Sequence, residues 1–431
     1  MVSSLAQALA GGELSATEVV AAYVVRINEL NPSINAIVQL PLERALEEAK
    51  DLDANSSKPP RSSLRGLPFT VKDNFETEGV ATAIGMLERK DLLPPRDAAL
   101  VRHVRGLGGI LLGKTNCPPG GGELFTDNDV YGRTNNPYDL TRTPGGSSGG
   151  EAAAIAAGMS PYGFGTDSGG SVRIPAHFCG IAAILPTARR LPVSGVVDDE
   201  GTIGTISDPR TRVGIMARSV ADLHLVLREI TPAPATEESL VPLIGKSPAD
   251  VNLSELRIAF QSDNRIALPT KETKRTITAA ARVLEHNGSS MYETDLPSGG
   301  HELTHEVWRS YGGEMRTAEL YAIMRRWDLY RRAVMTFFQN FDAILCPVFD
   351  TPAPEYGSIE TSGEGVSYTT PYSLTDCPSV VVRCGTSDEG LPIGVQIVAA
   401  PWRDEVTLAV AGHLERELGG WSPPPSLRER L

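Results

Sequence analysis

Two short clusters of serine and glycine stand out in the sequence: GGSSGG at residues 145–150 and DSGGSVRIP at residues 167–175. Ser147 of the first cluster and Ser171 of the second lie 24 positions apart, and Lys72, within PFTVKDN at residues 68–74, lies 75 positions before Ser147. Together these stretches supply a hydroxyl nucleophile, a second hydroxyl that can relay a proton, and an amine that can act as a base. We therefore expect the chemistry of the chain to centre on them.

Amide hydrolysis needs a nucleophile and a base that removes its proton. We assign Ser171 as the nucleophile, Ser147 as the relay and Lys72 as the base. Lys72 can accept a proton only when it is neutral, which requires a pKa roughly 2–3 units below its usual value. The apolar strand that precedes Lys72 would carry it into the interior, where burial supplies a shift of that size.

The nucleophile is preceded by small residues, which allow successive backbone N–H groups to converge on one point. We expect the N–H groups of Ser168, Gly169 and Gly170, with that of Ser171, to form the hole that stabilises the developing oxyanion.

The composition limits the class of protein. The chain has 431 residues, of which 41% are hydrophobic, and a formal net charge of −13. The acidic balance argues against binding to nucleic acid or to an anionic membrane. Five cysteines without a CxxC spacing favour a reducing compartment. With no secretory pattern at the N-terminus and no run of 18 apolar residues, we expect a cytoplasmic protein.

Helical and strand patterns alternate along the chain, which indicates an α/β layer architecture in a single domain over residues 1–431. A capping box at residues 15–18 predicts a helix that ends at Asn31-Pro32. Further strands are predicted at residues 67–71, 110–112, 257–260, 343–346, 379–382 and 394–398. Further helices are predicted at residues 98–105, 151–157, 221–229, 271–286, 313–338 and 405–415.

The stretch from residue 142 to residue 186 resembles the amidase signature family, whose members use a Ser-cisSer-Lys triad. The resemblance covers about residues 10–420, with the core signature at about residues 65–215. It implies a mixed central β-sheet flanked by helices on both faces, and a cis peptide bond between Gly146 and Ser147. It also implies that Arg173 pairs with Asp167 and holds the loop.

The resemblance further implies hydrolysis of a C–N acyl bond in a small-molecule substrate, with no metal or organic cofactor. Amides, aryl amides, carbamates (urethanes) and esters all form the same acyl-enzyme. The sequence departs from the family at Leu185, where a lysine is usual, which puts in doubt the contacts of that lysine behind the active-site loop. A monomer and a homodimer both stay open.

Two other functions share these features. The glutamine-hydrolysing subunit of a tRNA-dependent amidotransferase has the same triad but works inside a complex. Glu151 favours a stand-alone amidase, because the transamidation subunits usually carry serine there. A catalytically silent binding protein is the second rival, and the intact triad argues against it.

Gly120, Gly121 and Gly122 lie where the family borders its acyl pocket. Three glycines leave that wall without side-chain volume. We therefore predict a roomy pocket that accepts bulky or aromatic groups.

Two further motif matches are rejected. His301 and His305 fit the HExxH pattern of zinc peptidases, but no third ligand follows at a suitable spacing, so a solvated helix face is the better interpretation. Residues 108–115 fit the P-loop pattern, but the residues between its glycines read as a buried strand and no helix follows.

Overall fold

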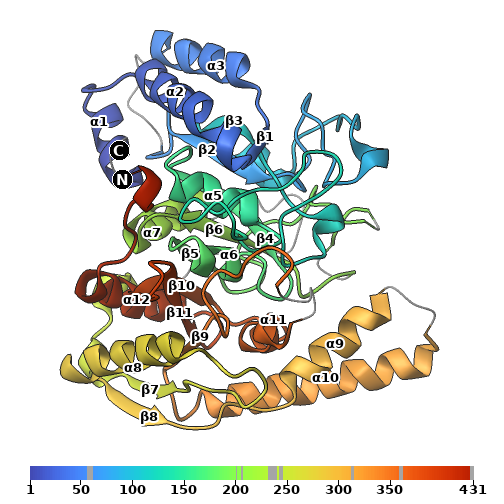
Figure 1. The fold of residues 1–431 in the computed structure, drawn as a ribbon, viewed down its shortest axis with the longest axis vertical. Coiled ribbons are helices and arrows are strands. Elements are labelled where there is room, and N and C mark those ends of the chain that lie inside the picture. The colour runs from blue at the N-terminus through green and yellow to red at the C-terminus, as the bar shows by residue number, and fades with distance from the viewer. Residues whose placement is uncertain are drawn as a thin grey trace.

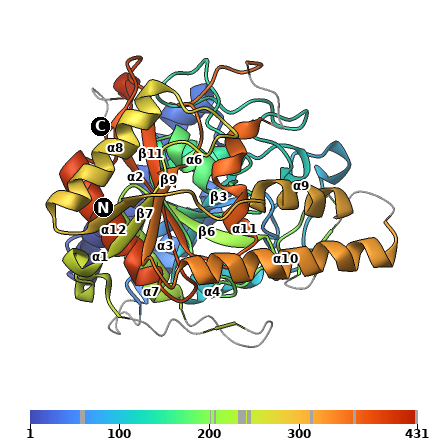
Figure 2. The ribbon, with the colours of Figure 1, turned by 90° about the horizontal axis from the view of Figure 1, so that it is seen from below.

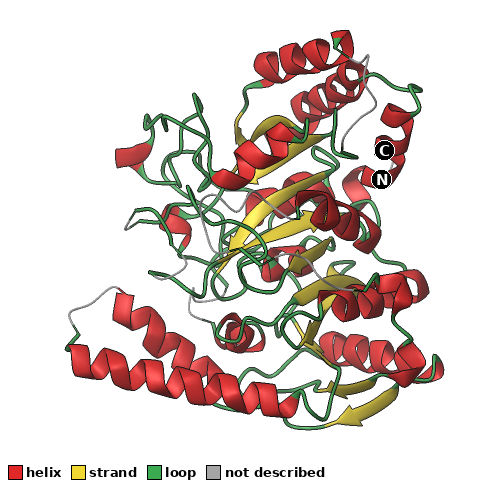
Figure 3. Ribbon diagram, turned by 180° about the vertical axis from the view of Figure 1, so that it is seen from behind, coloured by secondary structure: helices red, strands yellow, loops and turns green. Residues whose placement is uncertain are grey.

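A computed structural model describes residues 1–55, 62–199, 201–204, 207–231, 240–241, 246–311, 315–358 and 363–427. Within these residues one mixed sheet of eleven strands runs through the molecule (Figures 1 and 3), in the order β1-β3-β2-β4-β6-β5-β10-β11-β9-β7-β8. The strands are β1 Ile37–Gln39, β2 Pro68–Lys72, β3 Ile110–Thr115, β4 Tyr162–Asp167, β5 Ala182–Leu185, β6 Arg212–Ala217, β7 Arg257–Phe260, β8 Ser290–Glu293, β9 Ala343–Pro347, β10 Ser379–Thr386 and β11 Pro392–Ala399.

Helices cover both faces of the sheet (Figures 1 and 2), as the α/β pattern and the family resemblance predicted. One face packs in a single core against α1 Val2–Ala10, α4 Ala99–Gly106, α7 Val220–Ile230, α8 Lys271–His286 and α12 Asp404–Leu418. The other face carries α2 Ala16–Ile34, α3 Leu42–Ala54, α5 Gly149–Ala156, α6 Arg173–Phe178, α9 Gly300–Tyr311, α10 Thr317–Phe337 and α11 Thr370–Ser373.

The sheet brings the two predicted halves of the site to one edge. β2 and β4 are parallel neighbours, with Thr70 opposite Gly163. Their carboxyl ends therefore lie at the same edge of the sheet, where β2 ends at Lys72 and β4 at Asp167. Helix α5 begins directly after the Ser147-Ser148 pair, so its N-terminus faces the same region.

Most of the predicted elements are confirmed, although residues 313 and 314 of the predicted helix 313–338 lie outside the described residues. Two differences are instructive. Helix α2 continues past Pro32 to Ile34, because the N–H of Asn35 donates to the Asn31 carbonyl and Asn35, in a left-handed conformation, ends the helix. Strand β4 was missed in a glycine-rich stretch. In the described part of the chain, every helix is too short or too polar to cross a bilayer.

Candidate active site

Lys72 is buried at the end of β2 and contacts hydroxyl groups. Its Nζ lies 2.7 Å from Ser147 Oγ and 3.0 Å from Thr166 Oγ1. Burial lowers the pKa of Lys72 to about 8. The predicted contact between Lys72 and Ser147 is confirmed, and Lys72 has the depressed pKa that a base at this position requires.

The first serine cluster is tied to the second by its backbone. The peptide bond between Gly146 and Ser147 is cis, as the resemblance implied. The N–H of Ser148 donates to the Ser171 carbonyl at 3.0 Å. This bond places Ser171 beside the Ser147-Ser148 pair, and so brings all three predicted triad members into one region.

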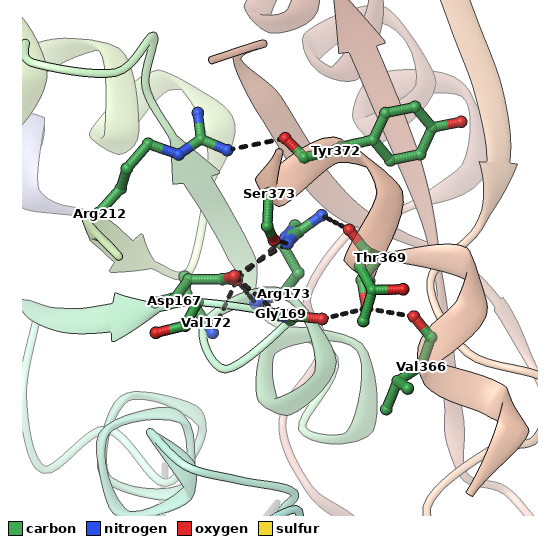
Figure 4. A network of polar contacts seen from close by, with 12 residues as sticks. Asp167, Gly169, Val172, Arg173, Arg212, Val366, Thr369, Tyr372 and Ser373 are labelled. Carbon is green, nitrogen blue, oxygen red and sulfur yellow. Dashed lines mark hydrogen bonds and ion pairs between the residues drawn. The ribbon is translucent and has the colours of Figure 1, made fainter. Parts of the chain in front are cut away.

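Asp167 and Arg173 clamp the loop that carries Ser171 (Figure 4). Both side chains are fully buried, and Arg173 Nη2 lies 2.8 Å from Asp167 Oδ1. The carboxylate also accepts the N–H groups of Gly170, at 2.7 Å, and Val172, at 3.1 Å. Burial acts to raise the pKa of Asp167, but the charge and hydrogen bonds of Arg173, together with the Val172 N–H, outweigh it and hold the pKa at about 2. The predicted ion pair is confirmed.

Arg173 also joins the loop to distant parts of the chain. Its Nη1 donates to the Thr369 carbonyl at 2.8 Å and to Gln396 Oε1 at 2.9 Å, and its Nη2 donates to Ser373 Oγ at 2.9 Å. All of these contacts are to the protein itself. They support the interpretation of Arg173 as a structural residue.

The oxyanion prediction needs one correction. The Gly170 N–H is already donated to Asp167, so it is not a free donor in this structure. Among the described residues, no hydrogen bond takes up the N–H groups of Gly169 and Ser171, and the Gly169 carbonyl is fixed by Thr369 Oγ1 at 2.6 Å. The Ser168 hydroxyl is engaged with Thr211 Oγ1. In the described part of the chain, no hydrogen bond takes up the Ser168 N–H either, so the N–H groups of Ser168, Gly169 and Ser171 are the available donors.

Gly121 lies at the Lys72–Ser147 pair. A Cβ at this position would lie 3.5 Å from Lys72 Nζ and 3.7 Å from Ser147 Oγ, and the backbone has φ +74°. A Cβ at Gly120 would instead meet Asp199. A Cβ at residue 121 would touch the Lys72–Ser147 pair at ordinary van der Waals distance, and the positive φ strains any side chain there. Gly121 therefore borders the predicted relay itself, and not only an acyl pocket.

Four buried polar residues near Lys72 were given no role by the sequence reasoning: Thr166, Asn74, Lys114 and Asp73. Thr166 holds the Lys72 amine and also accepts from Asn74 Nδ2 at 3.0 Å. Lys114 forms a fully buried ion pair with Asp73 at 3.1 Å. Lys114 belongs to the rejected P-loop match. Its position at the end of an apolar strand could have indicated that the lysine is buried and pairs with a buried acid.

Glu151 and Leu185 are both fully buried. The Glu151 carboxylate accepts from the hydroxyls of Thr70 and Thr115. Burial raises the pKa of Glu151 to about 8. Leu185 lies on β5 within the sheet. Glu151 is thus part of the buried core next to the site. A glutamate at this position is explained by its contacts with Thr70 and Thr115 and does not distinguish one substrate from another.

The HExxH histidines are partly exposed, and their rings also contact other side chains, so the helix face that carries them is only partly solvated. Their rings stack edge to face with centroids 4.5 Å apart, and His301 Nδ1 lies 3.1 Å from Thr370 Oγ1. Burial lowers the pKa of both imidazoles. The described residues contain no group of three or more His, Cys, Asp or Glu side chains that could hold a metal.

The residues of the rejected P-loop match form strand β3, as the sequence interpretation predicted.

Comparison with known proteins identifies the fold and its family. The amidase family model matches residues 18–312 and 308–408. A glutamyl-tRNA(Gln) amidotransferase subunit of Alkaliphilus metalliredigens is 30% identical, over 97% of this chain and 96% of its own. Indoleacetamide hydrolase of Bradyrhizobium diazoefficiens is 30% identical, over 96% and 86%.

A solved structure gives the same answer. The 6-aminohexanoate cyclic dimer hydrolase complexed with substrate matches with a TM-score of 0.87 and 26% identity, and the match covers 99% of this chain and 98% of that one. With the sheet, the cis peptide bond and the two serine clusters in place, these matches show that the chain belongs to the amidase family, the amidase signature enzymes.

Proposed function

We propose that this protein is an amidase that hydrolyses a C–N acyl bond through an acyl-enzyme at Ser171. The observation that carries this proposal is the buried Lys72 amine, which lies 2.7 Å from Ser147 and has a pKa lowered to about 8. A lysine in this state can be neutral at the pH where the enzyme works, and a neutral amine can accept a proton.

The proposed reaction moves one proton in a cycle. Ser171 Oγ attacks the acyl carbon while its proton passes to Ser147, and the Ser147 proton passes to Lys72. The N–H groups of Ser168, Gly169 and Ser171 stabilise the oxyanion. The C–N bond then breaks, the proton returns through Ser147 to the leaving nitrogen, and water hydrolyses the acyl-enzyme by the same route.

The proposed substrate is a small-molecule amide, with aryl amides, carbamates and esters within the reach of the same chemistry. The indoleacetamide hydrolase among the relatives acts, by its name, on an aromatic amide. The test is incubation of the purified chain with an alkyl fluorophosphonate and with 4-nitroacetanilide. Labelling of Ser171 and release of 4-nitroaniline support the proposal; an unlabelled Ser171 in a protein that cleaves no amide contradicts it.

A second candidate is the glutamine-hydrolysing subunit of a tRNA-dependent amidotransferase. The relative from Alkaliphilus metalliredigens favours it, because that protein is as similar to this chain as the indoleacetamide hydrolase. The two candidates differ in what the isolated chain can do. Turnover of simple amides without partners supports the stand-alone amidase. Release of ammonia from glutamine only when partner proteins and misacylated tRNA are added supports the second candidate.

A further inference from the structure

Helix α9 carries a row of aromatic side chains that the triad does not use. His301, His305 and Trp308 follow one another at helical spacing. The His305 ring meets the His301 ring at 4.5 Å and the Trp308 ring at 5.1 Å between centroids, both nearly perpendicular. Edge-to-face contacts of this kind fix the orientation of each ring. The row therefore holds Trp308 in one position on the helix.

The helix is anchored next to the active-site loop. Thr304 Oγ1 donates to the Thr370 carbonyl at 3.2 Å, and His301 contacts the Thr370 hydroxyl. The preceding residue, Thr369, donates to the Gly169 carbonyl. These bonds connect α9 through residues 369–370 to the oxyanion loop. In Figure 2, α9 and α11 are drawn next to each other.

Trp308 itself covers Gly169. A Cβ at Gly169 would overlap ring carbon Cζ2 of Trp308, so the indole edge rests on the bare backbone of that glycine. Gly169 is buried, whereas Trp308, Ser168 and Ser171 are all partly exposed. Gly169 precedes the nucleophile by two positions, so their Cα atoms are at most about 7.6 Å apart. This bound is about the length of an anilide group, so the Gly169 backbone that the indole covers lies within that length of the Ser171 Cα.

We propose that Trp308 is a specificity-determining residue, an aromatic wall over Gly169 that favours amides with a planar aryl group beside the scissile bond. This inference rests on the proposed amidase function. Aromatic rings prefer aromatic partners in stacked or edge-to-face contact, and an aliphatic amide of the size of acetamide gains little from the same wall. The α9 wall, and not the glycines at residues 120–122, then decides which substrates are preferred.

The test compares 4-nitroacetanilide with acetamide in Trp308→Ala, in Trp308→Phe and in a matched control, Trp402→Phe. Trp402 is also partly exposed, and its ring packs on Arg190. For Trp308→Ala we expect the ratio of kcat/KM for the aryl amide to that for acetamide to fall about tenfold. Trp308→Phe retains an aromatic ring, so most of the preference for the aryl amide is expected to remain. Trp402→Phe is expected to leave kcat/KM for both substrates unchanged. Equal losses for both substrates would show that Trp308 only supports the fold, which overturns the inference.

A binding measurement covers the case in which Trp308→Ala does not fold. In Ser171→Ala, which is expected to turn over too slowly to consume the ligand, 4-nitroacetanilide is expected to quench tryptophan fluorescence. This quench is expected to disappear when Trp308→Phe is added. A quench that persists without Trp308 overturns the inference. A wild-type protein that cleaves neither amide and is not labelled at Ser171 overturns the amidase function and this inference with it. A labelled, active enzyme whose selectivity does not depend on Trp308 overturns the inference alone.

Discussion

Lys72 and Lys114 are two buried lysines on neighbouring strands that have opposite surroundings. They lie near the ends of β2 and β3, which pair in parallel, and both are essentially inaccessible to solvent. Lys114 contacts the Asp73 carboxylate at 3.1 Å and the Thr82 hydroxyl at 2.6 Å. Lys72 contacts two hydroxyls, those of Ser147 and Thr166.

The difference shows how the partner decides the role of a buried amine. Burial lowers the pKa of both lysines, but at Lys114 the Asp73 charge opposes this effect. An amine beside a carboxylate is held as a cation, and removal of either partner leaves the other as an unpaired buried charge. An amine among hydroxyls can lose its proton, and the same hydroxyls can carry that proton to and from a nucleophile.

The largest expected effect is on turnover. We expect Lys72→Ala and Ser171→Ala each to reduce kcat by about 10⁴-fold, because members of a cooperating triad lose most of the rate individually. Ser147→Ala is expected to be severe but less complete, since water can replace a relay. Steady-state kinetics on 4-nitroacetanilide, with circular dichroism to check folding, measures the effect. A Ser171→Ala enzyme that keeps a few per cent of the wild-type rate would break the assignment.

The next effect is on stability, and it has opposite signs at the two lysines. Lys114→Met leaves Asp73 buried without its cation and is expected to destabilise the fold by about 3–5 kcal/mol. The folded pKa of Lys72 is about 8, below its unfolded value, so protonation opposes folding; this penalty is complete below pH 8 and fades as the pH rises towards the unfolded pKa. Lys72→Met removes this penalty, and its free energy of unfolding at pH 7 is therefore expected to exceed that of the wild type by on the order of 3 kcal/mol. Urea unfolding at pH 7 measures both; equal signs would contradict the comparison.

A smaller effect is expected at Glu151, the buried acid without a cation. Its folded pKa of about 8 lies above the unfolded value, so its contribution to stability is lost as the pH rises from the unfolded pKa to about 8. Glu151→Gln has no group that titrates here, so it does not show this loss. Its free energy of unfolding relative to wild type is expected to be up to about 3 kcal/mol more favourable at pH 7 than at pH 4. Unfolding free energies of both proteins at the two pH values test this. A difference that does not change with pH would show that Glu151 is ionised in the fold.

The smallest expected effect is that of chelators. The HExxH pair contacts Thr370 and Trp308 in the fold, and we expect activity to survive prolonged EDTA or phenanthroline treatment and to persist in His305→Ala. Activity that is lost to a chelator and restored by zinc would return the metallopeptidase interpretation.

The sequence predicted that Lys72, Ser147 and Ser171 lie together, which the contacts confirm, but it predicted their surroundings poorly, for a physical reason. Ser147 and Ser171 lie in short motifs whose residues are neighbours in the chain. Strand β4 was missed because glycine is rare in strand interiors, although Tyr162 and Phe164 alternate with Gly163 and Gly165. The strand forms between β2 and β6, and its glycines leave room for α5. A Cβ at Gly163 would overlap the Glu151 carboxylate, and a Cβ at Gly165 would overlap Ser148.

Contacts between distant segments were equally out of reach. Thr166 acts through Lys72, which is 94 residues away in sequence. Trp308 reaches Gly169 only because α9 folds back onto the loop. The Gly170 N–H is taken up by the Asp167 carboxylate. This contact depends on how the Asp167 side chain is placed, which the sequence motif does not predict. Such contacts are set by the packing of separate elements and leave no local pattern in the sequence.

The pH dependence of the reaction tests the central claim most directly. If Lys72 is the base, kcat/KM for 4-nitroacetanilide is expected to rise with pH and level off above a pKa near 8, as Lys72 loses its proton. The rate at which an alkyl fluorophosphonate labels Ser171 is expected to follow the same limb, and Lys114→Arg is expected to leave that pKa in place. A profile that is flat from about pH 6 to about pH 9.5, with the chemical step shown to limit the rate, would contradict the assignment of Lys72.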